Sequence, residues 1–527
     1  MSRLRLVVSS LVTASLLAAC SGAGPTAPVG GIPAGPAGAV RSKLPKFLRL
    51  ERTPPRPPPR RHMVTAAMRE RAKSGGWQEL SNLNTWTNGP ATALLMTDGT
   101  VLVQDYCTPD WYRLTPDSTG NYQDGKWTEV ATMPSSYGPL YFASAVLPDG
   151  KLIVNGGEYN FCVGDETNMG AIFDPTANSW TAVSAPSGWG QIGDGQSVVL
   201  NNGTYMIGNC CTSVQAQLDE ATMTWTQVGT GKHDNNSEEG WTLLRNGDIL
   251  TADVIQEPNS EVFNPKKSAW STAGSVPQNL TQDEEIGPQT MRPDNSVYVE
   301  GADGLTAIYA NGKWTDGPNM PTVNGEQLNA ADAPTSLLTD GTVLAVGSPG
   351  VYQTPAAFYI FDGKKNVSVT SPADAVNDSS YNIRVLLLPT GQVLEDDGSN
   401  DVEIYTGNQK PEASIAPAIS NVSKTLTAGS SYKLSGRRLN GFSQANFYGD
   451  DDQQATNYPL VRITNSGSGA VVYCRTHSFS SMAIGSNKVV STMFDVPSTI
   501  GTGSSTLVVV ANGIASKAVN VTIQPSK

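Results

Sequence analysis

The stretch Leu94-Leu95-Met96-Thr97-Asp98-Gly99 opens a pattern that recurs along most of the chain. It consists of an apolar strand, a turn with Asp or Asn next to Gly, and a second apolar strand. Such turns are typical of tight β-hairpins, because Gly and Asn accept the positive φ that these turns require. The last turn residue falls at seven positions, 44 to 53 residues apart: 99, 150, 203, 247, 295, 341 and 391.

A second feature follows most of these turns. An aromatic strand such as Ala171-Ile172-Phe173 comes first, and a tryptophan strand comes after it. The tryptophans are Trp127, Trp180, Trp225, Trp270 and Trp314. Four strands in roughly 48 residues make one propeller blade. The pattern resembles kelch repeats and predicts an all-β protein with a seven-bladed, kelch-type β-propeller over residues 76–410.

The two ends of this array complement each other. The last repeat ends in Val402-Glu403-Ile404-Tyr405 without a tryptophan strand, whereas Trp77-Gln78-Glu79-Leu80 precedes the first repeat without a hairpin of its own. We expect this N-terminal strand to complete the last blade, because a closed ring hides the edges of its sheets.

The repeat stops after Gln409-Lys410-Pro411. Short alternating strands follow, such as Pro459-Leu460-Val461-Arg462-Ile463 and Thr506-Leu507-Val508-Val509-Val510. These strands predict a small β-sandwich of the immunoglobulin-like (E-set) kind over residues 411–527.

The first twenty residues read as an export signal, with Arg3 and Arg5 before an apolar run that ends at Ala19. The end of this run resembles a bacterial lipobox. That resemblance implies lipidation of Cys20, membrane attachment through the N-terminal lipid only, and a place in the outer membrane of the cell envelope. A simple secretory signal, giving a periplasmic or secreted protein, is the alternative. Residues 21–75 are rich in Pro, Gly and basic residues and predict an extended linker.

Charge is divided unevenly along the chain. The net charge is −12, and residues 1–62 carry +9, so the remainder carries −21. An acidic body argues against nucleic acid as a partner.

Five cysteines remain after Cys20, and export places them in an oxidising compartment. They are Cys107, Cys162, Cys210, Cys211 and Cys474. An odd number leaves at least one thiol unpaired. A bridge between the loops of Cys107 and Cys162 and a vicinal bridge between Cys210 and Cys211 both fit the pattern, which does not choose between them.

A ligand site is expected where the loops before the innermost strands meet, on one face around the axis of a propeller. Counting nine residues back from each turn gives equivalent positions: Pro90, Tyr141, Asp194, Glu238, Ile286 beside Glu285, Asp332 and Asn382. Clustered carboxylates need a compensating cation or hydrogen-bond donors. Nearby aromatic residues, Tyr159 and Trp189 among them, are typical of sugar sites. Carboxylates that only cap strand ends and hold water are the alternative.

The two predicted domains together resemble galactose oxidase and glyoxal oxidase, the copper-radical oxidases. Tyr141 matches the segment that holds the cross-linked tyrosine of that family, Tyr381 matches a second copper-binding tyrosine, and His477 in Arg475-Thr476-His477-Ser478 matches a histidine ligand. The resemblance implies that these three residues form a catalytic copper site. However, Asn382 stands where the family has a histidine, and no cysteine stands near Pro90 to cross-link Tyr141.

We therefore expect a binding protein for a glycan or another small polar ligand, with no certain cofactor. A copper-dependent alcohol or aldehyde oxidase, a site for another divalent cation, and a scaffold for a cell-envelope protein are the alternatives. The expected ligand-binding residues are Tyr141, Tyr159, Trp189, Asp194, Glu238, Asp332, Tyr381 and Asn382.

Overall fold

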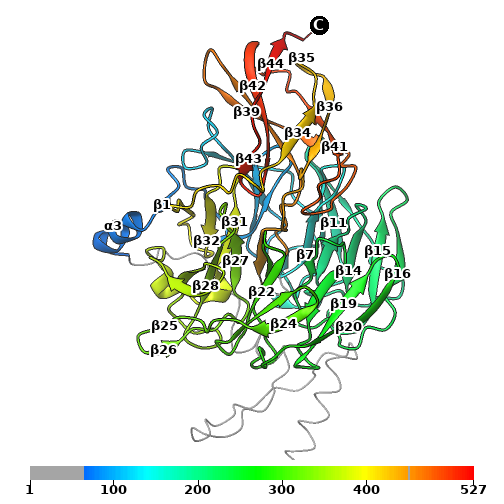
Figure 1. Cartoon of the computed structure of the whole chain (residues 1–527), viewed down its shortest axis with the longest axis vertical. Coiled ribbons are helices and arrows are strands. Elements are labelled where there is room, and N and C mark those ends of the chain that lie inside the picture. Colours follow the sequence, from blue (N-terminus) through cyan, green and yellow to red (C-terminus); the bar gives the residue numbers. More distant parts are fainter. Residues whose placement is uncertain (1–63, 449–451, 527) are drawn as a thin grey trace, which may run out of the picture. The chain divides into compact units, whose positions relative to one another are not determined.

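The computed structural model describes residues 64–448 and 452–526 (Figure 1). The predicted signal peptide, Cys20 and most of the basic linker lie outside these residues. The described chain begins with helix α3 (Ala66–Ser74), whose first turn is capped by the side chain of Thr65, and continues almost entirely as strands. The prediction of an extended linker is therefore wrong for these residues, because Ala72 and Met68 of α3 pack in a hydrophobic core. No helix among the described residues has the length and hydropathy that a membrane span requires.

Each of the seven predicted turns joins the first two strands of a separate antiparallel sheet. The first four sheets contain β2 (Pro90–Leu95), β3 (Val101–Asp105), β4 (Trp111–Thr115) and β5 (Lys126–Glu129); β7 (Ala143–Val146), β8 (Leu152–Asn155), β11 (Gly170–Asp174) and β12 (Ser179–Ala182); β13 (Ser197–Val199), β14 (Tyr205–Gly208), β15 (Gln215–Asp219) and β16 (Thr224–Val228); and β17 (Thr242–Leu243), β18 (Ile249–Ala252), β19 (Asn259–Asn264) and β20 (Ala269–Ser275).

The remaining three sheets follow the same plan. They contain β21 (Gln289–Met291), β22 (Ser296–Glu300), β23 (Thr306–Ala310) and β24 (Lys313–Asp316); β27 (Pro334–Leu337), β28 (Val343–Gly347), β29 (Ala357–Phe361) and β30 (Asn366–Ser368); and β31 (Arg384–Leu387), β32 (Val393–Asp396), β33 (Glu403–Tyr405) and β1 (Trp77–Glu79). Short additions are β6 (Pro139–Leu140), β9 (Tyr159–Asn160), β10 (Val163–Gly164), β25 (Thr322–Val323), β26 (Glu326–Gln327) and the 3₁₀ turns η1 (Ala375–Asn377) and η2 (Ser380–Asn382).

The hairpin turns have the backbone that the sequence predicts. All seven final turn residues have positive φ: Gly99, Gly150, Gly203, Gly247, Asn295, Gly341 and Gly391. The φ of Asn295 is 72°, close to the values of the glycines. A β-branched residue would be strained at these positions, so the local sequence fixes where each hairpin turns.

The N-terminal strand β1 pairs with β33, as expected, with Trp77 opposite Tyr405. Trp77 is 1% exposed, and its indole N–H donates to the carbonyl oxygen of Thr370 at 2.7 Å. The last sheet therefore receives its outermost strand from the opposite end of the array.

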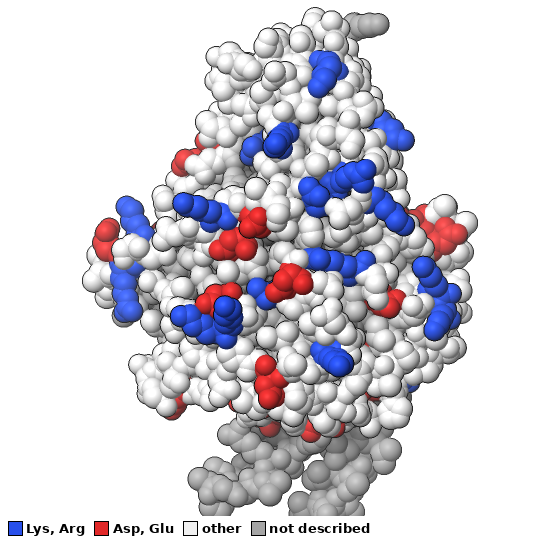
Figure 2. All heavy atoms as spheres, viewed as in Figure 1, with Lys and Arg blue, Asp and Glu red and all other residues white. Residues whose placement is uncertain are grey.

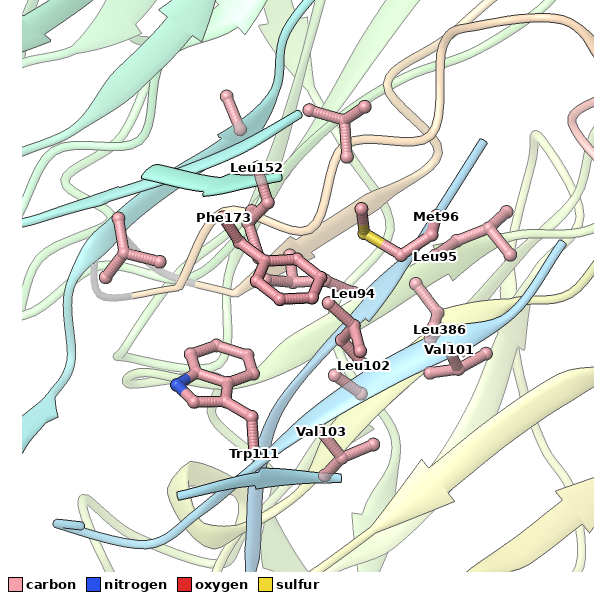
Figure 3. Packing of buried hydrophobic residues seen from close by; sticks show 14 of the residues in the cluster. Leu94, Leu95, Met96, Val101, Leu102, Val103, Trp111, Leu152, Phe173 and Leu386 are labelled. Atoms are coloured by element: carbon pink, nitrogen blue, oxygen red, sulfur yellow. The ribbon is translucent and has the colours of Figure 1, made fainter. Parts of the chain in front are cut away.

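Neighbouring sheets contact one another along two of their strands. We call the strand before each of the seven turns the innermost strand, and the strand at the other edge of the same sheet the outermost strand. The innermost strand β31 contacts both β2 and β27, and β21 contacts β17 and β27. Figure 3 shows one core that combines side chains of the first, second and last sheets, including Leu94, Leu152 and Leu386. On the outer strands, the Trp180 indole donates to Ala131, and those of Trp127, Trp225, Trp270 and Trp314 also donate to earlier parts of the chain.

The C-terminal strands form two sheets. One contains β34 (Ala418–Asn421), β36 (Ser431–Arg437), β40 (Thr476–His477) and β41 (Val490–Asp495), and the other contains β35 (Thr425–Thr427), β38 (Leu460–Asn465), β39 (Val471–Cys474), β42 (Gly503–Ala511), β43 (Ile514–Ala515) and β44 (Val519–Gln524). Leu434 and Phe494 of the first sheet share a buried core with Val461 and Val509 of the second.

One segment of the C-terminal part leaves these two sheets and lies among the innermost strands of the array. We call residues 444–448 and 452–454 the axial hairpin. Its strand β37 (Asn446–Tyr448) pairs with β27. Its polar side chains contact further innermost strands: Gln444 accepts from the backbone N–H of Leu243, and Gln454 donates to the carbonyl oxygen of Ala93. The sequence pattern did not predict this insertion.

Candidate functional site

Three carboxylates from successive sheets converge at the ends of the segments that lead into the innermost strands. Glu238, Glu285 and Asp332 each precede an innermost strand, and all three are buried. Each offers an oxygen that lies within 4.8 Å of an oxygen of the other two. The repeat register predicted this meeting for Glu238 and Asp332, and it placed Glu285 next to the equivalent position. Because the carboxylates come from different sheets, they meet only through the packing of neighbouring sheets.

Several residues of this register have left-handed backbone. The φ of Tyr141 is 52°, that of Glu238 is 60° and that of Asp332 is 46°. This conformation costs a non-glycine residue on the order of 1 kcal/mol, and it is concentrated at functional sites in proteins. The same backbone turn therefore recurs before several innermost strands.

Two tyrosines connect this carboxylate cluster with the segment before β31. The hydroxyl of Tyr352 donates to Glu285 and lies 3.0 Å from Asp332 Oδ2. The Tyr352 ring meets the edge of Tyr381, with 4.9 Å between ring centroids. The predicted residue Tyr381 is half-buried in η2 and is linked to the carboxylates through Tyr352.

An aromatic wall continues from Tyr381. The hydroxyl of Tyr448, in the axial hairpin, donates to the carbonyl oxygen of Tyr381. The Tyr448 ring stacks on Tyr141 at 6.3 Å, and Tyr141 meets the edge of Tyr159 at 6.1 Å. The predicted residues Tyr141 and Tyr159 therefore belong to the same continuous cluster as Tyr381.

A buried ion pair lies against this wall. Arg384 Nε is 2.9 Å from Asp452 Oδ2, and the guanidinium carbon lies 5.3 Å from the Tyr141 ring centre and 4.7 Å from that of Tyr448. Burial opposes the charge of Arg384, but the Asp452 carboxylate outweighs this effect and raises the pKa of the guanidinium well above its ordinary value. Arg384 therefore stays a fixed hydrogen-bond donor. We call the carboxylates, tyrosines and ion pair described so far the mouth site.

The other predicted ligand-binding residues have weaker links to this site. Asn382 follows Tyr381 in η2 and is half-buried. Asp194 is buried near Cys210. The hydrogen bond with Cys211 and burial raise the pKa of the Cys210 thiol, and the charge of Asp194 adds to this effect. Trp189 packs against the hydrophobic core, and its carbonyl oxygen accepts from Asn168. The structure therefore gives Trp189 a packing role rather than a place in the mouth site.

The predicted position of His477 is wrong. Its neighbour Thr476 donates its backbone N–H to Thr97, and Arg475 donates to Asp149. Both acceptors lie in the β-turns, at the opposite end of the innermost strands from Tyr141. The imidazole of His477 itself lies beside Asp495 and Ser478. The C-terminal part reaches the mouth through the axial hairpin instead, which brings Tyr448 and Asp452.

A copper site of the kind that the oxidase resemblance implies does not fit these residues. Tyr141 and Tyr381 are present, but none of the described residues of the mouth site is a histidine or a cysteine. His477 lies at the other end, and His233 has an exposed side chain. Cu(II) favours nitrogen ligands over a set of phenols and carboxylates, and the Arg384 cation lies against the wall.

One of the two possible disulfides is formed. Cys107 bonds to Cys162 and joins the loops of the first and second sheets. Among the described residues, Cys210, Cys211 and Cys474 are free thiols.

Sequence reasoning missed Arg384, Tyr448, Asp452 and Tyr352. Arg384 carried a signal, because a charged residue begins the otherwise apolar strand Arg384–Leu387. Tyr448 and Asp452 carried none, because their position depends on the path of the axial hairpin.

The acidic groups of the mouth site are internal. On the face drawn in Figure 2, basic and acidic side chains are interspersed rather than gathered by sign. A separate surface cavity of about 620 Å³ lies between α3 and the ends of β30 and β33, with Arg71 and Lys73 in its lining. It contains none of the residues that the repeat register selects.

No protein-family model matches the chain. A stretch of 130 residues is 29% identical to the Kelch-like protein terF of Aspergillus terreus (strain NIH 2624 / FGSC A1156). The match covers 24% of this chain and 26% of that protein, so the chain spans about a quarter of its relative. This distant similarity agrees with a kelch-like repeat protein.

Two solved structures share a general likeness. A catalytically inactive virginiamycin B lyase from Staphylococcus aureus, solved with quinupristin, has a TM-score of 0.47 at 10% identity and covers 63% of this chain and 99% of its own. The extracellular domain of the one-component system BT4673 from B. thetaiotaomicron has a TM-score of 0.43 at 11% identity, covering 85% and 59%.

Proposed function

We propose that this protein is a seven-bladed kelch-type propeller (residues 76–410) with an immunoglobulin-like C-terminal domain (411–527), and that it binds a small polar ligand or glycan at the mouth site. The contact of β31 with both β2 and β27 supports a closed ring. The uninterrupted series of contacts from Tyr159 through Tyr141, Tyr448 and Tyr381 to the carboxylates carries the functional proposal.

The chemistry of this series favours a polyhydroxylated ligand. Tyrosine rings pack against the C–H faces of a sugar. Arginine only donates hydrogen bonds and an ionised carboxylate only accepts them, whereas a hydroxyl does both. A ligand with several hydroxyls can therefore use Arg384 and Asp332 together. A purely cationic ligand would gain nothing from Arg384.

Asp332→Asn tests this proposal, because it removes the charge while keeping the shape. We expect affinity for the best ligand from a panel of oligosaccharides to fall at least tenfold, about 1.4 kcal/mol. Isothermal titration of the purified protein measures this. Glu326→Gln, at an exposed position of β26, is the matched control and should bind as the parent does. Equal affinities for the parent and Asp332→Asn, or no binding by the parent, would contradict the proposal.

A protein scaffold remains the second candidate. Phe161 and Val163 are 43% and 66% exposed and lie next to the Cys107–Cys162 disulfide. Two neighbouring exposed apolar side chains are a small surface, and the other large exposed apolar residues come from separate elements. The observations therefore favour the mouth site over a scaffold for a cell-envelope partner.

We also propose export and lipid anchoring, with residues 1–20 as the signal, Cys20 as the lipidated residue and residues 21–63 as a linker in the cell envelope. Cys20→Ser should release the protein from the membrane fraction or stall its processing, because the thioether to the lipid cannot form. Immunoblots of fractionated cells measure this. Normal maturation and membrane association of the variant would refute the anchor.

A further inference from the structure

A second buried charged cluster lies in the fourth sheet, outside the mouth site. Its members are Lys232, Asp234 and Glu239 in the loop before β17, Asp253 directly after β18, and Glu261 in β19. All five are less than a tenth exposed. With every group ionised, four carboxylates face one ammonium, so the cluster carries a charge of −3.

Most of these groups have partners. Lys232 Nζ lies 2.6 Å from Glu239 Oε1 and 2.8 Å from Glu261 Oε2. Asp234 Oδ2 accepts three consecutive backbone N–H groups, those of residues 254–256, at 3.0 to 3.2 Å. The lysine therefore compensates Glu239 and Glu261, and the backbone compensates Asp234.

Asp253 is the exception. Its side chain is 3% exposed, and neither carboxylate oxygen has a hydrogen-bond partner among the described residues. One of its oxygens lies within 4.8 Å of oxygens of both Asp234 and Glu239. Buried polar groups without a partner are rare in proteins, and a buried carboxylate beside two others is especially unfavourable. A further positive charge is therefore required between these three residues.

We propose that Asp234, Glu239 and Asp253 bind a divalent cation, and that Ca²⁺ is the ion their chemistry favours. Three carboxylates supply hard oxygen ligands from two loops and leave room for backbone or water oxygens, which suits the six to eight ligands of Ca²⁺. Mg²⁺ demands a stricter octahedron and keeps more of its water.

A proton is the competing occupant. Burial raises the pKa of Asp253 to about 7 and that of Glu239 to about 8, although Lys232 lowers both. Unfolding exposes these carboxyls, which then ionise near their ordinary values of about 4. The metal-free folded protein therefore binds more protons than the unfolded one between about pH 4 and 8, and its stability falls as the pH rises through this range. Ca²⁺ would replace these protons and bind more tightly at pH 8 than at pH 6.

The cation would also fix part of the mouth site. Glu239 is adjacent in sequence to Glu238, whose carboxylate belongs to the mouth. The loop that binds the ion therefore carries a mouth residue, although the cation site does not depend on the identity of the mouth ligand.

The test uses the full mature protein from which bound metal has been removed with EDTA, and CaCl₂ alone is the probe. Isothermal titration calorimetry measures Ca²⁺ binding, and differential scanning calorimetry measures the melting temperature. At a hundredfold excess over Kd, we expect Ca²⁺ to raise the melting temperature of the parent by about 3 °C. Asp253→Asn should melt above the parent in EDTA, because it removes an uncompensated charge. It should bind Ca²⁺ at least tenfold more weakly.

Asp374→Asn is the matched control, since Asp374 belongs to a different buried group of carboxylates. It should keep the Ca²⁺ response of the fourth sheet. If Asp253→Asn does not fold, Glu239→Gln replaces it, since it removes a second carboxylate of the same group, and it should also bind Ca²⁺ at least tenfold more weakly. No Ca²⁺ binding by the parent, or an unchanged Ca²⁺ response in a folded ligand variant, would overturn the proposal.

Discussion

A chain that begins at residue 81 should be much less stable than a chain that begins at residue 76, because it lacks β1. Trp77 is 1% exposed and packs between Phe358 and Tyr405, with ring centroids 4.8 and 4.9 Å away. Replacing such a tryptophan by alanine alone costs about 3–5 kcal/mol. Removing the whole strand also leaves β33 as an open edge. We therefore expect a loss of at least about 5 kcal/mol in the free energy of unfolding.

Guanidinium denaturation followed by circular dichroism compares the two chains directly. Trp77→Ala in the longer chain separates the contribution of the side chain from that of the strand. If the shorter chain unfolds at nearly the same denaturant concentration as the longer one, β1 is a dispensable addition to the last sheet rather than its closure.

Local rules explain why so much of the fold was predictable. A turn such as that of Asn295 depends on the φ of one residue, and the sequence states that preference directly. The pairing of Trp77 with Tyr405 required only the observation that one repeat lacks a strand and the N-terminus has one to spare. Equivalent positions in a repeat then placed Glu238 and Asp332 in one cluster.

The features that the sequence did not predict depend on the course of the C-terminal part through the fold, which no local sequence pattern indicates. The axial hairpin comes from the C-terminal part, and its hydrogen bonds join residues hundreds of positions apart, such as Gln454 and Ala93. His477 was assigned to the mouth from a resemblance between short segments. The segment instead forms β40, which pairs with β41 and lies near the hairpin turns of the first two sheets. An alignment of short motifs therefore could not place His477.

Asp253 is a further example of a residue whose role depends on segments that are distant in the sequence. Its sequence position after an apolar strand indicates only a loop carboxylate. Its charge is unfavourable because Asp234 and Glu239, which belong to the loop before β17, lie close to it in the folded protein. Sequence reasoning can list such carboxylates, but it cannot say which of them lack a partner.

Arg384→Met should destabilise the protein by about 3–5 kcal/mol, because it leaves the buried carboxylate of Asp452 without its cation. Asp452 is 2% exposed, and it also accepts from the hydroxyl of Thr92. Methionine fills much of the volume of the arginine stem, so the loss reports mainly on charge. Asp452→Asn should be destabilising for the converse reason, since it leaves a buried guanidinium.

The double variant Arg384→Met with Asp452→Asn identifies the interaction. With both charges gone, neither partner is left uncompensated, so the double variant should be more stable than the sum of the two single losses by about 2 kcal/mol or more. Guanidinium denaturation of the four proteins supplies the cycle. Additive losses, or single variants within about 1 kcal/mol of the parent, would mean that water reaches this ion pair. In that case, the axial hairpin would be held by its backbone and amide contacts, and Arg384 would be a mobile side chain rather than a fixed donor in the mouth site.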